Sequence, residues 1–485
     1  MCELDLPLKF AQKLYNEFAI RHPNAFYLRT RQRGMQNWDG KIHYITKTGQ
    51  FKIGLLPKVY DMCIEMGIKP KVVDMRQPLP KVSKVVTNIG KYKLRPEQEK
   101  AVKAVINNKI GNTPFHIGVL DYTVNAGKTL IMSSLYLSYK KQLKTLLITN
   151  DSDWLNQARE EFKQYLPGED ITFVQGKVLN WSNFTIGMVQ SISRNMRFYQ
   201  KELSQIDMVL IDEADQGGSK QYQNVITRLF NTRIRIGLSG TIYMSKLTKD
   251  RVKNMNLECF FGKVLAEFKL KDSIKKGYST KTVVKMVPGK PWYGNWESDC
   301  ISYKEIYDDS ITENNTAWTM AYNRLRWNLN QGRYPALVVC KHIAHCENLY
   351  KFFKKKLGDA YNIAYVHVNT PSKLRQQIMK DFREGKIDIL VSTTIIARGK
   401  NFPKLKYLLN TASMDSQEKS IQFLGRLVRT DESKNKVYLD DLHYPGNYLD
   451  RHGKHRKQYY QRQELKVILL DKLWKKHPNH SLIKS

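Results

Sequence analysis

The chain has 485 residues, of which 41% are hydrophobic, and its 80 Lys and Arg residues outnumber 45 Asp and Glu residues. The hydrophobic fraction is sufficient for buried cores and excludes global disorder, and the length allows roughly three domains. The formal net charge of +35 predicts a polyanionic partner. Nucleic acid is favoured, because neutralised phosphates release condensed counterions, and a membrane surface is the alternative.

No apolar run approaches the roughly 20 residues that a membrane-spanning helix needs, and the start of the chain lacks the apolar segment of a signal peptide. We therefore expect a cytoplasmic protein without a membrane partner. The six cysteines form no Cys-x-x-Cys pair, which argues against a disulfide framework or a zinc ribbon. One cluster has ligand types that suit zinc, but its spacing fits no finger, and a strand–helix corner is the favoured interpretation. Its members are Cys340, His342, His345 and Cys346.

Residues 1–90 are predicted to form a small, separate α+β module that binds DNA. Residues 41–45 and 51–55 alternate apolar and polar side chains around a glycine-bearing turn, a pattern typical of a β-hairpin. Three arginines recur at every second residue, so an extended strand would present them on one face. The alternative is a solvated basic strand whose aromatics form a small core. The candidate DNA contacts are Arg29, Arg31, Arg33, Trp38 and Lys41.

A candidate phosphate-binding loop lies further along the chain, where residues 119–129 end in Gly-Lys-Thr and lead into a predicted helix. Backbone N–H groups and the positive end of a helix dipole can surround a phosphate there. The lysine would contact the outer phosphates and the threonine would hold Mg²⁺. The usual pattern has a glycine where this chain has Tyr122. The candidate nucleotide contacts are Asn125, Ala126, Gly127, Lys128 and Thr129.

A short apolar run, residues 206–211, predicts a buried parallel strand that delivers acidic residues at its carboxyl end. Asp212 is placed to hold Mg²⁺, and Glu213 to orient and deprotonate the attacking water. The alternative is a solvated acidic corner, which a phosphate loop on the same sheet makes less attractive.

A third candidate element, residues 422–429, contains Arg426 and Arg429. Because they lie three residues apart, they would share one face of a helix. Paired guanidinium groups can stabilise charge on the γ-phosphate of a nucleotide bound elsewhere. The alternative is a basic amphipathic helix on the surface.

Together these motifs resemble those of superfamily 2 helicases, in the family's order, from about residue 90 to about residue 445. The resemblance implies ATP and Mg²⁺ as cofactors and DNA as partner, with RNA in a hybrid as a further possibility. It assigns adenine recognition to Arg95 and Gln98 and adds Gly399 to the nucleotide contacts. The coupling residues that it implies are Asp215, Ser239, Thr241 and Gln422. The nucleic-acid contacts that it implies are Thr149, Gln190, Lys341, Thr393 and Arg398.

Apolar runs alternate with helical patterns, which predicts an α/β fold with two doubly wound parallel sheets. The resemblance identifies them as two tandem RecA-like motor domains, residues 91–270 and 271–445. Residues 446–485 are expected to form a basic helical extension, with residues 467–474 at roughly helical spacing. Its basic side chains, Arg456 among them, either contact phosphates or belong to a solvated terminal helix that is docked only by Leu469, Leu470 and Trp474.

Flanking segments, residues 38–42, 48–49, 53–56 and 452–456, are similar to those of a phage recombination helicase. This resemblance implies unwinding or branch migration of forks, Holliday junctions and R-loops in replication and recombination, by a protein that we expect to be monomeric. The alternatives are an RNA helicase or RNA-remodelling ATPase on the same motor, and a DNA-binding protein that uses ATP only as a switch. A restriction-type translocase is a weaker alternative.

Overall fold

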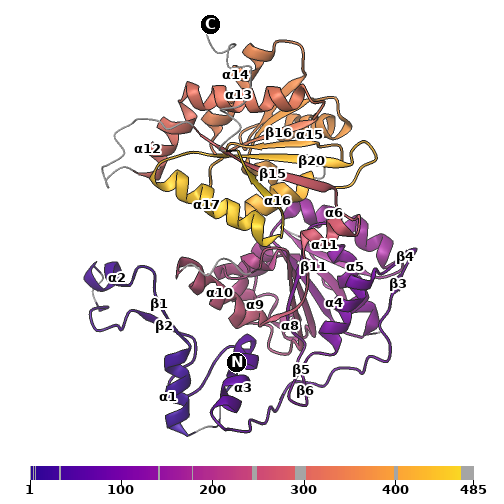
Figure 1. Cartoon of the computed structure of the whole chain (residues 1–485). Coiled ribbons are helices and arrows are strands. Elements are labelled where there is room, and N and C mark those ends of the chain that lie inside the picture. Colours follow the sequence, from indigo (N-terminus) through magenta and orange to yellow (C-terminus); the bar gives the residue numbers. More distant parts are fainter. Residues whose placement is uncertain are drawn as a thin grey trace. The chain divides into compact units, whose positions relative to one another are not determined.

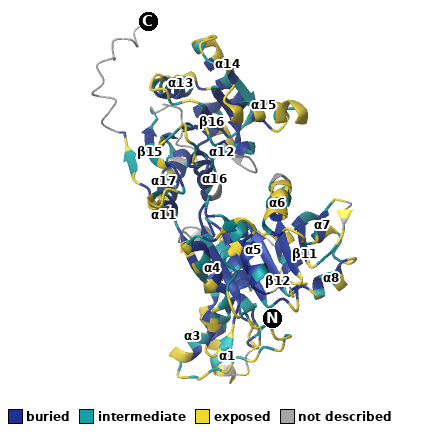
Figure 2. Cartoon of the chain, turned by 90° about the vertical axis from the view of Figure 1, so that its right-hand side faces the viewer, coloured by how far each residue is buried: buried dark blue, intermediate teal, exposed yellow. Residues whose placement is uncertain are grey.

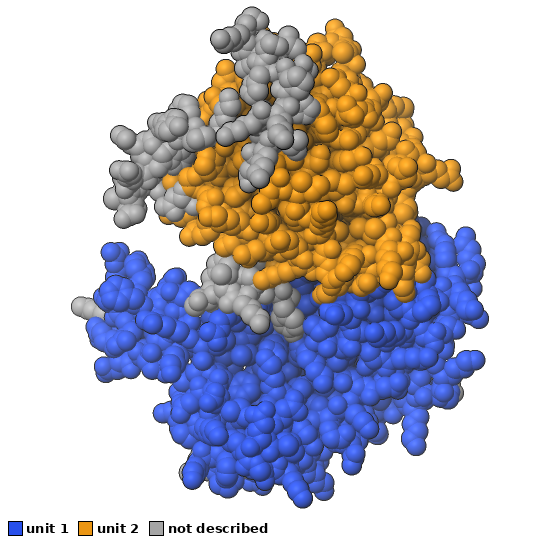
Figure 3. Space-filling view, viewed as in Figure 1, with its two compact units in different colours: residues 1–268 blue, residues 269–485 orange. Residues whose placement is uncertain are grey.

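The structure is a computed structural model of the whole chain (Figure 1). It describes all residues except 1, 4, 6, 32–33, 140–141, 177, 243–247, 290–301, 398–401 and 471–485. The strands of two parallel sheets are the most deeply buried elements, while helices such as α15 and α3 expose their outer faces (Figure 2). The chain divides into two compact units, residues 1–268 and 269–485 (Figure 3).

The first unit is built on an eight-stranded sheet with the order β10-β9-β11-β8-β12-β13-β7-β14, in which only the β10–β9 pair is antiparallel. Its central strands are continuous buried apolar runs, as expected when helices cover both faces of a parallel sheet. The strands are β7 (Ile117–Tyr122), β8 (Thr145–Thr149), β9 (Ile171–Gln175), β10 (Val178–Leu179), β11 (Phe184–Met188), β12 (Met208–Asp212), β13 (Ile234–Ser239) and β14 (Val264–Phe268).

Helices connect these strands. Two short antiparallel pairs, β3–β4 and β5–β6, come directly before and after helix α4 in the sequence. The helices are α4 (Pro96–Ile106), α5 (Lys128–Ser138), α6 (Ser152–Tyr165), α7 (Val189–Arg194), α8 (Gln200–Ser204), the 3₁₀ turn η2 (Ala214–Gln216), α9 (Lys220–Ile226) and α10 (Thr248–Phe261). The short strands are β3 (Asn88–Ile89), β4 (Tyr92–Lys93), β5 (Lys109–Ile110) and β6 (Thr113–Pro114).

The N-terminal segment differs in detail from its sequence prediction. Its elements are α1 (Leu8–Glu17), β1 (Ala19–Arg21), α2 (Ala25–Arg31), β2 (Lys41–His43), η1 (Ile53–Leu55) and α3 (Leu56–Glu65). The expected turn forms, closed by an isolated bridge between Ile45 and Phe51, but β2 pairs with β1 rather than with the following segment, which is 3₁₀-helical. The prediction that the arginines lie on one face of an extended strand is wrong. Arg29 and Arg31 lie on α2, where residues two apart point in different directions. Arg33 lies outside the described residues.

The N-terminal segment shares an apolar core with the sheet of the first unit. Leu14, Phe18 and Leu55 belong to the same buried cluster as Leu146 and Phe261. Turn η1 packs on α10 so closely that a side chain at Gly54 would collide with the backbone carbonyl of Glu258. The segment is therefore rooted in the first unit, while the functional boundary near residue 90 stays a prediction.

The second unit contains a seven-stranded sheet with the order β17-β18-β16-β19-β20-β15-β21, parallel throughout. The two tandem RecA-like parallel-sheet domains are thereby confirmed. The strands are β15 (Lys281–Pro288), β16 (Ala336–Cys340), β17 (Ile363–Val366), β18 (Ile389–Thr393), β19 (Tyr407–Asn410), β20 (Lys436–His443) and β21 (Val467–Leu469). The helices are α11 (Leu270–Lys275), α12 (Tyr303–Tyr307), η3 (Asp308–Thr312), α13 (Asn315–Leu329), α14 (Ile343–Leu357), α15 (Ser372–Glu384), η4 (Thr394–Ala397), α16 (Gln417–Leu427) and α17 (Asn447–Arg462).

The C-terminal segment is part of this sheet and its packing. The helical spacing expected from residue 467 onward is wrong, because Val467–Leu469 forms the edge strand β21 beside β15. The expected phosphate contact of Arg456 is also wrong, since this side chain on α17 is fully buried. Residues 471–485 lie outside the described part of the chain. Among the described residues, no helix is both long and apolar enough to cross a bilayer.

Two buried ion pairs hold helices to strand β20. Alternate residues of a strand point to opposite faces, so Asp440 and Asp441 face opposite helix layers. Asp440 accepts hydrogen bonds from Arg324 of α13. Asp441 lies 2.8 Å from the Nη2 atom of Arg456, and Tyr460 of α17 donates to the same carboxylate at 2.8 Å. Ion pairs, as well as apolar packing, therefore hold α13 and α17 on the sheet.

The buried Arg456–Asp441 pair leads to a stability prediction. Replacing Arg456 with Met leaves a buried carboxylate without its cation, and we expect this to cost about 3–5 kcal/mol of unfolding free energy. Lys454→Met, on the exposed side of the same helix, breaks a surface pair with Asp450 and should cost less than about 1 kcal/mol. Urea unfolding followed by tryptophan fluorescence measures both. Equal effects of the two substitutions would contradict the structural role of the pair.

Candidate functional site

The phosphate loop connects the carboxyl end of β7 to the start of α5. Asn125 and Gly127 both take left-handed conformations, with φ of 64° and 71°. Gly127 caps α5, so Lys128 is the first residue of the helix. The loop therefore presents backbone N–H groups at a helix N-terminus, which is the geometry that binds phosphate. Asn125, Ala126, Gly127, Lys128 and Thr129 follow one another through this loop into α5, and their contacts with a nucleotide stay a prediction.

Residues at the start of helix α4 hold this loop through hydrogen bonds. Gln98 is fully buried, and its Nε2 atom donates to the Ala126 carbonyl at 2.8 Å, while its Oε1 atom accepts from the Arg95 backbone at 2.8 Å. Arg95 donates to the Asn125 carbonyl at 3.0 Å. A side chain at position 127 would collide with the Gln98 amide. Gln98 and Arg95 thus fix the loop conformation, and their adenine contacts stay a prediction.

Tyr122 stands where the usual phosphate-loop pattern has a glycine, and its side chain has a structural role. Its side chain is fully buried, and its hydroxyl donates to the Glu97 carbonyl at 2.7 Å. The hydroxyl therefore ties the end of β7 to the first turn of α4. A glycine at this position would lack that tie, so the substitution in the motif adds a support for the loop.

The acidic motif meets the loop at the carboxyl end of β12. The Lys128 Nζ atom lies 3.6 Å from the Asp212 Oδ1 atom. Burial raises the pKa of Asp212 to about 6 even though Lys128 opposes this. Burial also opposes the charge of Lys128, but Asp212, Glu213 and Asp215 outweigh it and raise the pKa of the ammonium. The predicted catalytic lysine and acid are therefore neighbours.

The donor set at this point fits Mg²⁺. Beyond the ion pair, the buried Oδ1 atom of Asp212 accepts no hydrogen bond from the residues that the structure describes. Carboxylate and hydroxyl oxygens are the ligands that Mg²⁺ takes beside phosphate. Asp212 and Thr129, on adjoining elements, are therefore suited to hold the ion with a bound triphosphate. Glu213 follows at once in a left-handed conformation, with φ of 51°.

The predicted coupling residues of the first unit lie in one hydrogen-bonded group. Ser239, at the end of β13, donates to the Asp215 carboxylate at 2.8 Å. Thr241 contacts the Ser239 hydroxyl through its backbone N–H at 3.1 Å and through its own hydroxyl at 3.2 Å. All three residues are buried. The acidic motif is therefore bonded directly to the neighbouring strand end.

A second contact route leads from the acidic motif toward the predicted nucleic-acid residues. Asn150, which follows Thr149 at the end of β8, donates to the side chain of Gln216. Gln190 of α7 donates to the Asn150 carbonyl at 3.4 Å. The sequence interpretation included neither Asn150 nor Gln216 among the site residues. Two positions in the sequence could have indicated them: Asn150 follows a predicted strand directly, and Gln216 follows the acidic motif directly.

In the second unit, several predicted residues gather at the carboxyl ends of the strands. Lys341 follows β16, and its Nζ atom lies 3.8 Å from the centre of the Tyr303 ring. Thr393 ends β18, and the adjacent Thr394 accepts from Lys419 of α16 at 3.3 Å. Gln422 lies on the same helix. Arg398 and Gly399 lie outside the described residues.

The prediction that Arg426 and Arg429 share one face of a helix is wrong. Helix α16 ends at Leu427, so Arg426 lies in its last turn and Arg429 beyond it. The carbonyls at this end are engaged elsewhere: Lys434 donates to Leu427 and the Thr280 backbone donates to Val428. These bonds satisfy two of the carbonyls at the end of the helix. The roles of both arginines toward a nucleotide stay predictions.

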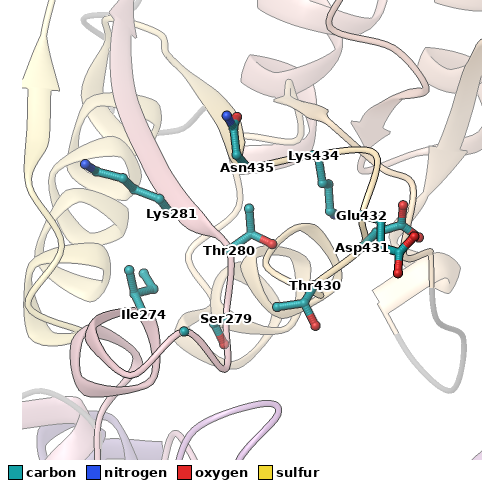
Figure 4. Close-up of a pocket in the computed structure, with 10 residues that line it drawn as sticks. Ile274, Ser279, Thr280, Lys281, Thr430, Asp431, Glu432, Lys434 and Asn435 are labelled. Atoms are coloured by element: carbon teal, nitrogen blue, oxygen red, sulfur yellow. The ribbon is translucent and has the colours of Figure 1, made fainter.

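A pocket of about 600 Å³ lies next to this helix end. Figure 4 shows Ile274 and Lys281 on one side of it and Asp431 and Glu432 on the other. Burial lowers the pKa of Lys434, which also lines the pocket, to about 8. None of the ten lining residues belongs to the predicted nucleotide site. The pocket walls instead support the segment that carries Arg429.

Comparison with known proteins identifies two family domains and several relatives. A family model described as "Type III restriction enzyme, res subunit" matches residues 91–244, and one described as "Helicase conserved C-terminal domain" matches residues 320–431. The putative ATP-dependent helicase IRC3 of Saccharomyces cerevisiae is 23% identical over 378 residues, covering 72% of this chain and 51% of the relative. The putative helicase 22 of a Sulfolobus islandicus filamentous virus is 23% identical over 385 residues, covering 73% and 64%. The chain thus spans less than two thirds of either relative.

A solved structure shows the same fold. A fragment of a putative HsdR subunit of a type I restriction enzyme from Vibrio vulnificus matches with a TM-score of 0.56 at 15% identity, covering 77% of this chain and 67% of that one. The structure of T4 UvsW matches with a TM-score of 0.44 at 19% identity and covers 96% of both chains.

The close approach of Gly127 to Gln98 leads to a test of the phosphate loop. A left-handed conformation costs an alanine roughly 1–2 kcal/mol at any exposed position. At position 127 the added methyl group also displaces the Gln98 amide, so we expect Gly127→Ala to weaken binding of a fluorescent ATP analogue. Gly168 has φ of 80°, and a methyl group added there would have no atom within 4 Å, so Gly168→Ala is the matched control. Unchanged nucleotide affinity in Gly127→Ala would contradict the loop assignment.

Proposed function

Because the chain belongs to the superfamily 2 helicases, we propose that it is an ATP-dependent DNA helicase or translocase. Its substrates are branched DNA: forks, Holliday junctions and R-loops in replication and recombination. One observation carries the proposal. The Lys128–Asp212 pair, with 3.6 Å between Nζ and Oδ1, lies at the sheet edge where β8 ends at Thr149 and where β11 leads into α7, which carries Gln190. A nucleotide site and a nucleic-acid site on one sheet edge are what a motor requires.

ATP is held by the phosphate loop and hydrolysed by the acidic motif. The loop N–H groups and Lys128 bind the outer phosphates. Thr129 and Asp212 would hold Mg²⁺, which would neutralise charge on the phosphate oxygens. Glu213 accepts a proton from the attacking water as general base. Arg426 and Arg429 stabilise the charge that develops on the γ-phosphate. Asp215, Ser239 and Thr241 pass the change in nucleotide state to the strand ends.

Nucleic acid is bound through its backbone. The contacts assigned to Thr149, Gln190, Lys341, Thr393 and Arg398 would grip phosphates and sugars, which carry no sequence information. The charge of +35 supports such binding and makes it strongly salt-dependent. The preference for branched DNA rests on the sequence likeness of the flanking segments to those of a phage recombination helicase.

The catalytic assignment is tested with Lys128→Ala and Glu213→Gln. Loss of a general base lowers the rate by roughly 10²–10⁴-fold, so we expect DNA-stimulated ATP hydrolysis to be lost in Glu213→Gln while DNA binding persists. Lys128→Ala should lose hydrolysis through loss of the phosphate contact. Lys103→Ala and Glu99→Gln remove an exposed pair on α4 and serve as matched controls. Continued turnover in both site variants would refute the assignment.

The assignment of Arg426 is tested by separating turnover from affinity. An arginine that acts on the transition state contributes roughly 10³–10⁵-fold to turnover, so Arg426→Ala should lower the ATPase rate far more than the affinity for ATP. Arg383→Ala, an exposed arginine on α15 of the same unit, is the control. A large loss of affinity with turnover spared would contradict this role.

The substrate is tested with a panel of single-stranded, duplex, forked, four-way-junction and RNA–DNA substrates at stated salt. ATPase stimulation and strand displacement by forks and junctions are the expected outcome. Stimulation by RNA alone would identify an RNA-remodelling ATPase. ATP hydrolysis without strand displacement or branch migration would identify an ATP-switched binding protein.

A further inference from the structure

Helix α2 carries two adjacent aromatic side chains that face solvent. Phe26 is 80% exposed and Tyr27 is 54% exposed. The Arg31 guanidinium carbon lies 4.9 Å from the centre of the Tyr27 ring. Single exposed apolar side chains are common on protein surfaces. Adjacent aromatic rings with cations beside them are, however, the components of surfaces on which nucleobases stack.

The arm that carries α2, residues 19–43, is fixed at its base. Strands β1 and β2 pair in register from Ala19–His43 to Arg21–Lys41. The His22 backbone donates to the Gly40 carbonyl at 2.8 Å, and a methyl group at Gly40 would lie 3.2 Å from that of Ala25. Figure 1 shows α2 beyond β1 and β2, on the far side of the strand pair from α1. The arm thus presents its aromatic tip away from its own core.

Other aromatic residues of the segment are engaged in the structure. Trp38, the indole expected to contact DNA, donates its Nε1–H to the Lys41 carbonyl at 2.8 Å and packs edge-on against His22. Tyr15 stacks on His43, with 3.8 Å between ring centroids. Tyr44 donates to the Val252 carbonyl at 3.4 Å. Phe26 and Tyr27 are therefore the aromatic residues of the arm best placed to receive a ligand.

The charge of the arm selects among possible ligands. Five basic residues stand against one acid, Asp39. That acid is engaged within the arm, since it accepts from the Lys41 backbone at 2.9 Å and lies 2.7 Å from the His43 Nε2 atom. This charge suits an anionic ligand, and the exposed rings suit one with flat apolar faces. Unpaired nucleic acid combines both properties, whereas the bases of an intact duplex are covered by their neighbours. The basic residues are Arg21, Arg29, Arg31, Arg33 and Lys41.

We propose that α2 is a stacking surface for an unpaired base next to a single-strand–duplex junction. Phe26 stacks on the base, and Arg29 and Arg31 contact the flanking phosphates. This inference rests on the proposed function and adds to it a residue that engages the opened strand. It also places this contact on α2 rather than on Trp38.

The test uses the full chain without nucleotide and forked DNA with 5-iodouracil at the first unpaired position. We expect photocrosslinking to the peptide that contains Phe26 and Tyr27. Stacking on one aromatic contributes roughly ten- to hundredfold to affinity, so Phe26→Ala should weaken fork binding by about that factor. Phe26→Trp should bind close to wild type, and Phe26→Leu should bind as weakly as Phe26→Ala. Phe230, 62% exposed and preceding the amino end of β13, gives the matched control Phe230→Ala.

Fork affinity of Phe26→Ala equal to that of Phe230→Ala would overturn the inference. Recovery of binding in Phe26→Leu would overturn it too, because leucine offers an apolar contact without a flat ring. Loss of binding to phosphatidylserine vesicles but not to forks would assign α2 to a lipid surface instead. Wild-type ATPase stimulation by DNA is measured in parallel. Its absence with the crosslink present would refute the motor proposal alone, and an unaffected Phe26→Ala fork complex in an active motor would refute the stacking surface alone.

Discussion

The cation beside the buried carboxylate of Asp212 is the interaction on which the ligand edge of the first unit depends. Asp212 ends a central strand and is 3% exposed, so its charge needs compensation. Lys128 supplies it because α5 begins at that residue, and α5 begins there because Gly127 adopts a left-handed conformation. That conformation is in turn supported by Gln98. The charge of the Asp212 carboxylate is therefore compensated by an arrangement that depends on residues far apart in the sequence.

The second unit uses buried charge in a different way, to hold helix α16. Arg456 fixes α17 to strand β20, and α17 contacts the segment that leads into α16. Tyr459 and His455 of α17 bond to Asp415 at 2.7 and 3.0 Å. Lys434 engages the carbonyl at the other end of α16. The helix that carries Gln422 and Arg426 is therefore held at both ends by residues outside the recognised motifs.

Sequence alone was a good guide to the sheets and to the nucleotide loop. The strand runs at residues 208–211 and 336–340 are short, continuous and apolar, a pattern typical of a strand that is covered on both faces. Gly127-Lys128-Thr129 specifies local backbone geometry, which needs little tertiary information. The acidic motif could be placed because it follows such a strand directly.

The predictions that failed depended on tertiary context. The arginines at 29 and 31 alternate as in a strand, but α2 forms because the segment folds back between β1 and β2. Residues 467–469 have apolar side chains that fit either period, and an open sheet edge beside β15 decided the outcome. Arg456 was read as surface charge because its partner Asp441 lies on a different element. Partners of this kind cannot be identified from spacing.

The five residues from Asp212 to Gln216 contact three other elements at the carboxyl edge of the first unit's sheet. Asp212 faces Lys128, Asp215 accepts from Ser239, and Gln216 accepts from Asn150. The strained backbone at Glu213 and the tight turn η2 that follows give the stretch little freedom to deform between these contacts. Under the proposed function, a displacement of Asp212 or Glu213 on binding or loss of the γ-phosphate would move Asp215 and Gln216 as well. Asn150 bonds to Gln216 and to Gln190, so two hydrogen bonds would carry the displacement to the predicted nucleic-acid contacts.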